Sequence, residues 1–355
     1  MNLTPFGPYT SHPMNLELLT RAPVGLLPVL IFLVALLYMD SYKLVRLRVI
    51  LVVIAAGGMM TVAGYFINGF ISEWSGISFG YYTRYVAPVV EEGLKAVIIV
   101  YLFRTHRIGF LVDAAIMGFA VGAGFAVIEN FFYLYRISDA SMAVWVVRGF
   151  GTAIMHGGVT AIFGILSQTL TERNMKINPV LYLPGLIMAT TLHSLFNHFV
   201  VNPMTQTMVI LVVLPPVLWL VFRQSAQHMH EWLQLDFDED ANLLEQINSG
   251  EFRETKVGRF LNDLRQKFDG PVVVDMLCYL RIYTELALRA KGVLMMRENG
   301  LDAPIGERTH AKFEELAFLE GSIGATGLMA MKPFLHMTRK DLWQLYVLDS
   351  TRRAP

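Results

Sequence analysis

Several ionisable side chains lie inside long apolar stretches of this sequence. They are carboxylates, histidines and one lysine: Glu91, Glu92, Lys95, Glu129, His156 and His193. A charge near the centre of a bilayer is costly, so residues of this kind usually serve a function. Carboxylates and histidines transfer protons and bind divalent cations, and both properties activate water for hydrolysis. These residues are therefore the candidates for a site inside a membrane.

Apolar segments long enough to cross a bilayer must carry these residues, and a membrane helix needs about 20 residues. The sequence predicts seven spans, at residues 22–39, 47–70, 85–103, 110–135, 144–170, 179–201 and 204–222. The last two are separated only by Asn202 and Pro203, so they form either two spans or one re-entrant hairpin. The predicted fold is all-α, a polytopic membrane helix bundle of about seven spans.

Basic residues in the short loops orient these spans, because cytoplasmic loops carry an excess of Lys and Arg. Eight cations share one side of the predicted bundle: Lys43, Arg46, Arg48, Arg104, Arg107, Arg173, Lys176 and Arg223. The opposite side has four, namely Arg21, Arg84, Arg136 and Arg148. This distribution predicts an N-terminus outside the membrane and a C-terminus in the cytoplasm.

Charge is unevenly divided along the chain. Of the 355 residues 54% are hydrophobic, and the basic and acidic residues number 29 each. Residues 1–222 carry 21 of these charges, whereas the last 133 residues carry 37. We therefore expect an extracytoplasmic tail at 1–21, a transmembrane domain at 22–222 and a soluble, helical cytoplasmic domain at 223–355. Helical spacing of apolar residues in 271–297, 307–320 and 338–348 predicts the helices of this last domain.

The composition also excludes some classes of protein. A net charge of zero without a basic tract gives no electrostatic footprint for nucleic acid. The single cysteine, Cys278, rules out an internal disulfide framework and a zinc site built from clustered cysteines. The lipid bilayer is the partner that the composition itself predicts.

The candidate residues share one depth when residues are counted from the ends of the predicted spans. Glu91 and Glu92 lie six or seven residues inside the outer end of the third span, and Glu129 lies about six residues from the outer end of the fourth. His156 lies eight residues below Arg148 in the fifth span, or deeper if that span starts earlier, and His193 lies about eight residues from the outer end of the sixth. At 1.5 Å per residue the depths are roughly 9–12 Å. Four helices thus place proton- or metal-binding groups in one layer of the outer half of the membrane.

Spacing along each helix adds a second regularity. Lys95 follows Glu91 by four residues and Glu92 by three, so the lysine shares a helix face with both carboxylates. His156 and Thr160 are four residues apart, as are His193 and Asn197. Each histidine therefore has a polar neighbour on its own helix face.

Four motifs occur in order, each in its own predicted span: Glu-Glu-Gly-Leu-Lys at 91–95, Phe-Ala-Val-Ile-Glu-Asn at 125–130, His156 with Thr160, and His193 with Asn197. In this pattern the chain resembles the PrsW family of bacterial intramembrane proteases, which is related to the CAAX prenyl endopeptidases and to bacteriocin-processing proteins. The resemblance covers residues 20–205. It implies hydrolysis of a peptide bond in a membrane-anchored protein substrate, an anti-sigma factor in the typical case, in the inner (cytoplasmic) membrane of a bacterium.

For amide hydrolysis we expect Glu91 to be the base that activates water. Glu92 is expected to orient the site or to hold Lys95. The metal ligands are expected to be one carboxylate and two histidines, the donor set of many catalytic zinc sites: Glu129, His156 and His193. The expected cofactor is a divalent metal, with zinc the first choice.

Two alternatives remain open. The related endopeptidases suggest a mechanism without metal, in which glutamate and histidine activate water and Asn197 stabilises the oxyanion. A different class of function, an ion- or proton-coupled transporter, would use the same buried cluster as a relay. Transport predicts paired halves with discontinuous helices, and the sequence has no such symmetry apart from the break at Asn202 and Pro203. Near the cluster, Asn130 either joins the site or bridges helices, and Arg148 either reaches the interface or contacts a carboxylate.

Overall fold

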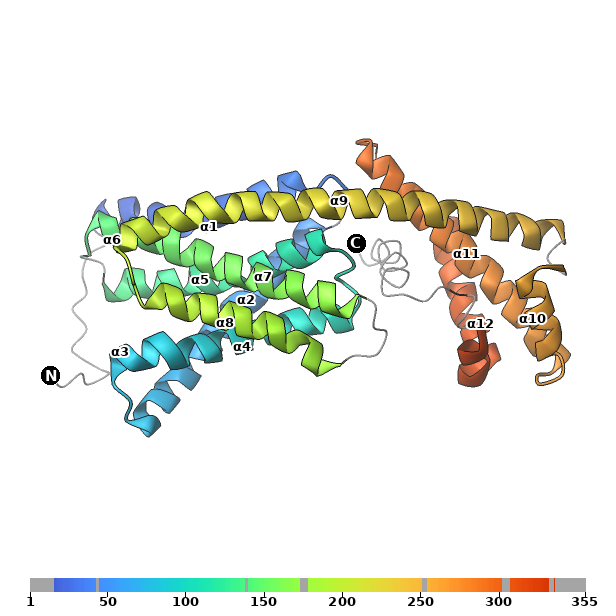
Figure 1. Cartoon of the computed structure of the whole chain (residues 1–355), viewed down its shortest axis with the longest axis horizontal. Coiled ribbons are helices and arrows are strands. Elements are labelled where there is room, and N and C mark those ends of the chain that lie inside the picture. Colours follow the sequence, from blue (N-terminus) through green and yellow to red (C-terminus); the bar gives the residue numbers. More distant parts are fainter. Residues whose placement is uncertain are drawn as a thin grey trace.

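The computed structural model describes residues 16–42, 45–137, 140–172, 178–250, 254–301, 307–331 and 335. Within these ranges every regular element is a helix, which confirms the predicted all-α class. Figure 1 shows two parts: a bundle that contains α1 to α8 and the beginning of α9, and a smaller group of helices, α10 to α12, reached along α9.

The elements of the bundle begin and end as follows: α1 Leu16–Met39, α2 Leu47–Ser75, α3 Phe79–Tyr81, η1 Tyr82–Val86, α4 Ala87–Arg104, α5 Leu111–Arg136, α6 Met142–Val146, η2 Val147–Thr152, α7 Ala153–Thr171, η3 Pro179–Tyr182 and α8 Leu183–Asn197. They are followed by α9 Pro203–Ser249, α10 Lys256–Leu264, α11 Gly270–Glu298 and α12 Glu307–Met331. Both η1 and η2 are short π-helical segments, each continuous with the α-helix that follows it.

Six of the described helices are long and apolar enough to cross a membrane, and together they form a polytopic bundle. They are α1, α2, α5, α6 with α7, η3 with α8, and α9. The predicted third span, residues 85–103, does form a helix, but α4 is not among the six. Its 18 residues include four charged ones, Glu91, Glu92, Lys95 and Arg104. The count of seven therefore included one helix whose apolar sequence is interrupted by charges, the ionisable residues of interest.

Several predicted boundaries differ from the observed ones. The last predicted pair of spans is not a re-entrant hairpin, because α9 continues for 47 residues, about 70 Å, against a hydrocarbon thickness of about 30 Å. It runs without a break through the predicted domain boundary at residues 222 and 223. Helix α1 already begins at Leu16, inside the predicted tail. The predicted helix at 338–348 lies outside the described residues.

Helix α5 lies at the centre of the bundle, and 83% of its most apolar stretch is buried. Glycines allow the backbones of its neighbours to approach it closely. A Cβ atom added at Gly124 would lie 2.0 Å from the carbonyl oxygen of Ile54 on α2. One added at Gly122 would lie 2.2 Å from the carbonyl oxygen of His156 on α7. The close contact between α5 and α7 brings residues of these two helices within reach of each other.

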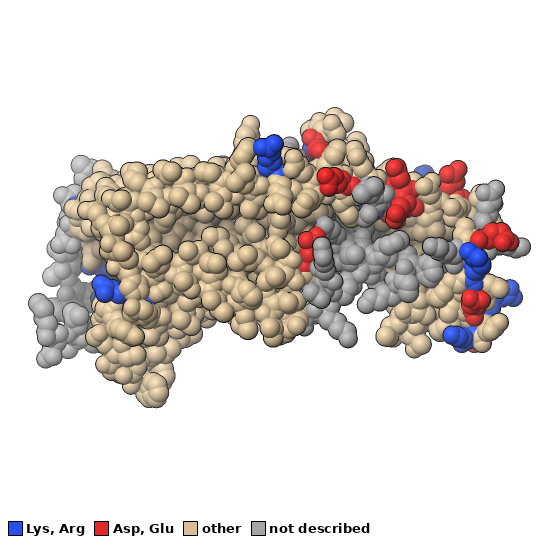
Figure 2. All heavy atoms as spheres, in the orientation of Figure 1, with Lys and Arg blue, Asp and Glu red and all other residues tan. Residues whose placement is uncertain are grey.

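The smaller part has its own apolar core, which includes Met276 and Leu286 of α11 and Ile323 of α12. Most of the charged residues visible in Figure 2 lie over this part and the adjoining end of α9, whereas the visible face of the bundle is almost uncharged. The hydroxyl of Tyr279 donates a hydrogen bond to Glu320 at 2.9 Å. Burial, together with this carboxylate, raises the pKa of Tyr279 above its usual value.

A separate cluster of apolar side chains joins the two parts of the molecule. It contains Tyr42 and Phe110 from loops of the bundle, Met229 and Leu233 from α9, and Leu294 from α11. Because Phe110 directly precedes α5, this cluster packs the smaller part against the start of the central helix.

We expect Gly124→Ala to destabilise the bundle by about 1–3 kcal/mol, because the new methyl group would overlap the backbone of α2. Thermal unfolding in detergent micelles measures this effect. Gly69→Ala on α2 is the matched control, since a Cβ atom there meets nothing within 4 Å. Equal unfolding temperatures for the two variants would contradict the close packing of α2 on α5.

Candidate active site

A buried ion pair lies within helix α4. The ammonium of Lys95 is 2.6 Å from the carboxylate of Glu92, and the two side chains are 0% and 2% exposed. Thr160 of α7 lies beside this pair, its hydroxyl 3.5 Å from Glu92. Because both charges are removed from water, each depends on the other for compensation. Glu92 is thus paired with Lys95, and whether its role is to hold the lysine or to orient the site stays a prediction.

His193 of α8 contacts this pair through Glu92. Its Nδ1 lies 2.7 Å from Oε1 of Glu92, and the ring is 2% exposed. A carboxylate only accepts hydrogen bonds, so Nδ1 carries the proton and donates the hydrogen bond. In the neutral form of the ring the lone pair is then on Nε2, which lies 3.8 Å from Oε2 of Glu91. Glu92 thus fixes the ring so that its free nitrogen faces Glu91.

His156 of α7 contacts the other member of the pair. Its Nδ1 lies 2.9 Å from Nζ of Lys95. An ammonium group only donates hydrogen bonds, so here Nδ1 accepts and the proton of the neutral ring is on Nε2. That nitrogen lies 3.3 Å from Oε2 of Glu129 on α5. With both rings neutral, Nε2 of His193 accepts a hydrogen bond whereas Nε2 of His156 donates one, although the two ring centres are only 4.7 Å apart.

Glu129 is held on its other side by Arg148 of the π-helical segment η2. Nη2 of Arg148 lies 3.2 Å from the carboxylate of Glu129. The guanidinium is itself fixed, since its Nε donates to Oδ1 of Asn130 at 2.8 Å and it lies 3.7 Å from the ring centre of Tyr133. Asn130 also donates to the carbonyl oxygen of Gly25 at 2.7 Å and so bridges helices. Arg148 is therefore a carboxylate partner at the edge of the cluster.

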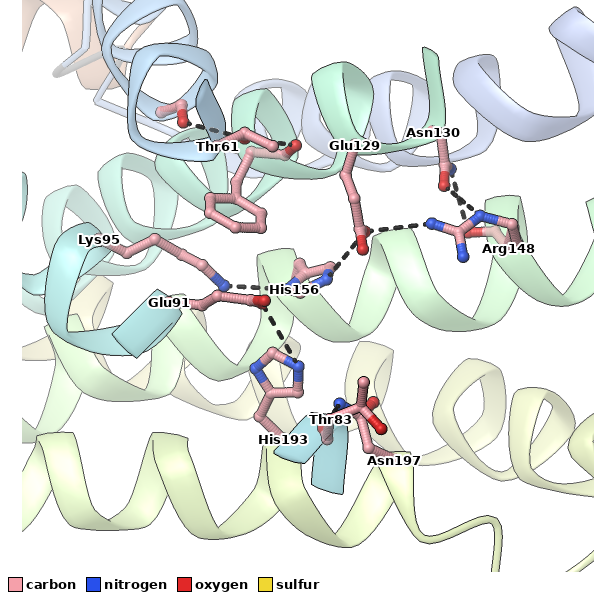
Figure 3. Close-up of polar contacts among 12 residues, drawn as sticks. Thr61, Thr83, Glu91, Lys95, Glu129, Asn130, Arg148, His156, His193 and Asn197 are labelled. Carbon is pink, nitrogen blue, oxygen red and sulfur yellow. Dashed lines mark hydrogen bonds and ion pairs between the residues drawn. The ribbon is translucent and has the colours of Figure 1, made fainter. Parts of the chain in front are cut away.

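Figure 3 shows how the side chains of four helices meet, with Glu91, Lys95 and Glu129 pointing toward His156 and His193. Every residue of the predicted layer is present in this cluster. The residues lie near the same end of the bundle, because α4 and α7 begin there and α5 and α8 end there. Glu91 and Glu129 keep some exposure, 15% and 22% for their side chains, whereas the histidines and Lys95 are buried.

Asn197 does not point into the cluster. Its Nδ2 donates to the carbonyl oxygen of Thr83 in the π-helical segment η1, at 3.0 Å (Figure 3). A neighbouring side chain, Ser194, donates to the carbonyl oxygen of Arg84 at 2.6 Å. Both bonds fasten α8 to η1, so the geometry gives Asn197 a structural contact, and its role in oxyanion stabilisation stays a prediction.

Two residues near the cluster are absent from the sequence-based candidates. Asn68 of α2 donates from Nδ2 to Oε1 of Glu91 at 3.3 Å. Tyr82 of η1 donates from its hydroxyl to Oδ1 of Asn68 at 2.9 Å. A lone amide in an otherwise apolar span is the signal that could have indicated Asn68. The sequence gives no comparable signal for Tyr82, because tyrosines are common at the ends of membrane helices whether or not they serve a site.

Among the described residues, one group of side chains is close enough together to bind the same metal ion. Glu91, His156 and His193 each offer one ligand atom, and these atoms lie within 4.8 Å of one another. The sequence-based set contains Glu129 in place of Glu91, and the structure groups the histidines with the other carboxylate. Two histidines and a carboxylate match the donor set of catalytic zinc sites, so the residues fit a divalent cation.

The hydrogen bonds of the histidines bear on this fit. A histidine that binds a metal usually donates its other N–H to a carboxylate or carbonyl group, as His193 does to Glu92. For His156 to bind through Nε2, one proton must leave the pair that it forms with Lys95. The carboxylate of Glu129, 3.3 Å from Nε2 and partly exposed, is placed to receive it and pass it on to solvent. Proton release on binding is a general property of such sites.

A bundle of apolar helices around a buried carboxylate–histidine cluster is the arrangement that an intramembrane hydrolase needs, and comparison with known families shows the class. The profile of the PrsW family of intramembrane metalloproteases matches residues 45–221, about half of the chain. The chain belongs to this family and is a peptidase, which confirms the resemblance found in its motifs. The matched range contains the whole cluster. No curated protein and no solved structure matches the chain.

Replacing Lys95 by Met would leave the buried carboxylate of Glu92 without its cation. We expect a loss of about 3–5 kcal/mol in the free energy of unfolding. The double variant Lys95→Met/Glu92→Gln removes both charges while keeping an oxygen that accepts from His193, so it should recover part of the loss. Thermal unfolding in detergent compares the two. A double variant less stable than Lys95→Met alone would contradict the importance of charge pairing.

Proposed function

We propose that this intramembrane protease cleaves a membrane-anchored protein at the cluster of Glu91, Glu129, His156 and His193. The observation that carries the proposal is that ligand atoms from three helices lie within 4.8 Å of one another, with a second carboxylate beside them. The family supports peptide-bond hydrolysis. The proposed substrate class, following the resemblance, includes single-span anti-sigma factors.

We assign the two carboxylates to different tasks. Glu91 is proposed as the metal ligand together with His156 and His193, because it belongs to the close group. Glu129 is proposed as the base, because it lies outside that group, next to His156 and held by Arg148. This exchanges the tasks expected from the sequence, in which Glu91 is the base and Glu129 the ligand. The original assignment remains the alternative.

In the proposed reaction, Glu129 accepts a proton from a water molecule while the water oxygen adds to the carbonyl carbon of the scissile bond. The carbon–nitrogen bond then breaks, and Glu129 returns the proton to the leaving nitrogen. Arg148 keeps the Glu129 carboxylate in place through the contact at 3.2 Å. A divalent cation bound at the ligands would polarise the substrate carbonyl and favour the hydroxide form of water.

Exclusion of bulk water supports this assignment. His156, His193 and Lys95 are each at most 2% exposed, so interactions among them are only weakly screened. The partial exposure of Glu91 and Glu129 leaves an approach for a substrate on their side of the cluster. A substrate segment would have to unfold locally to present its backbone there, since a helix satisfies its own carbonyl groups.

Glu91→Gln and Glu129→Gln form a matched pair that separates the two tasks. We expect Glu91→Gln to lose bound metal, and Glu129→Gln to keep it while cleavage falls at least about a hundredfold. Metal content of the purified protein is measured by elemental analysis, and cleavage with a library of single-span reporter proteins. The opposite pattern would restore the original assignment. Full cleavage by both variants would refute the site.

We also propose that the cluster faces the extracytoplasmic half of the membrane, with α10 to α12 in the cytoplasm of a bacterium. The support is the distribution of cations among the short loops. The single cysteine makes this testable without substitution, because Cys278 is exposed on α11. A membrane-impermeant maleimide should label it only after cells are opened. Labelling in intact cells would invert the topology.

A further inference from the structure

The carboxylate of Glu91 has different partners at its two oxygens. Oε2 faces Nε2 of His193 at 3.8 Å, whereas Oε1 accepts a hydrogen bond from Nδ2 of Asn68 at 3.3 Å. Asn68 comes from α2, which packs against both α4 and α5. One oxygen is therefore hydrogen-bonded to a neighbouring helix, while the other faces His193, another of the proposed ligands.

The amide of Asn68 is held in one orientation. A carboxylate can only accept, so the NH₂ group must face Glu91 and the amide oxygen must face away. The hydroxyl of Tyr82 donates to that oxygen at 2.9 Å, and the side chain of Tyr82 is only 3% exposed. A rotated amide would place its NH₂ group against Tyr82 and its oxygen against a carboxylate. The carboxylate of Glu91 therefore sets the orientation of the amide, and Tyr82 supports it by donating to the amide oxygen.

The position of Tyr82 is set in turn by the π-helical segment that it begins. The carbonyl oxygens of the next two residues, Thr83 and Arg84, accept hydrogen bonds from Asn197 and Ser194 of α8. Hydrogen bonds from α8 therefore hold the backbone of η1, and the side chain of Tyr82 on this segment contacts Asn68 of α2, which contacts Glu91. The same helix α8 carries His193, so α8 helps to position two of the three proposed ligands, Glu91 and His193.

We propose that Asn68 is a positioning residue for the Glu91 carboxylate and that Tyr82 acts on Glu91 only through Asn68. This inference rests on the proposed role of Glu91 as a metal ligand. The hydrogen bond from Asn68 to Oε1 fixes the rotamer of Glu91, so that Oε2 already faces the position that a cation would occupy. Loss of such a bond typically weakens metal binding or activity by roughly 10–100-fold.

The test measures Co²⁺ binding to purified, chelator-treated full-length protein in detergent, followed by visible absorption. We expect Asn68→Leu, which keeps the side-chain size, to weaken Co²⁺ binding at least about tenfold and to alter the absorption bands. Tyr82→Phe, which removes one oxygen atom, should give a smaller loss. The double variant should bind Co²⁺ no more weakly than Asn68→Leu alone, since Tyr82 acts through the amide.

Tyr65→Phe is the control for removal of a tyrosine hydroxyl, because Tyr65 lies on the same helix as Asn68 with 53% of its surface exposed. It should bind Co²⁺ like the wild type. Wild-type affinity and bands in Asn68→Leu, or additive losses in the double variant, would overturn the positioning role. If the wild type itself binds no Co²⁺, the assignment of the metal ligands fails together with this inference. Tyr82→Phe keeps the question open to test should Asn68→Leu not fold.

Discussion

A lysine and a glutamate that are both cut off from water hold the centre of this bundle together. Neither Lys95 nor Glu92 can lose its partner without leaving a bare charge in an apolar interior. Each also contacts one histidine, Glu92 the ring of His193 and Lys95 the ring of His156. The need to compensate one buried pair therefore fixes the relative positions of α4, α7 and α8.

That arrangement requires helices to pack closely, and the glycines of α5 allow it. The backbone of α7 approaches so near to Gly122 that a methyl group would overlap the carbonyl oxygen of His156. The same contact places His156 beside Glu129, at 3.3 Å. In a membrane, where apolar surface alone gives little preference for one helix pair over another, small residues decide which backbones meet. Packing and chemistry are thus linked at the same residues.

The buried pair also makes the two histidines unequal. A carboxylate behind His193 and an ammonium behind His156 place the ring protons on opposite nitrogens, so one Nε2 offers a lone pair and the other a proton. Glu91 and Glu129 face these two nitrogens separately. An asymmetric cluster of this kind suits hydrolysis, in which one group must bind or accept while another donates. The π-helical segments η1 and η2 supply the outer supports, Tyr82 and Arg148.

The sequence by itself determined the class of fold and that Glu91, Glu92, Glu129, His156 and His193 lie near one end of their helices, because hydropathy and residue counts report position along a helix axis. It did not determine how the helices are rotated about their axes, which depends on contacts between them. Only the tertiary structure therefore grouped Glu91 rather than Glu129 with the histidines, turned Asn197 toward η1 and brought Asn68 to the site. The charges of α4 interrupt its apolar sequence, and α9 continues as one helix past the point where hydropathy changes.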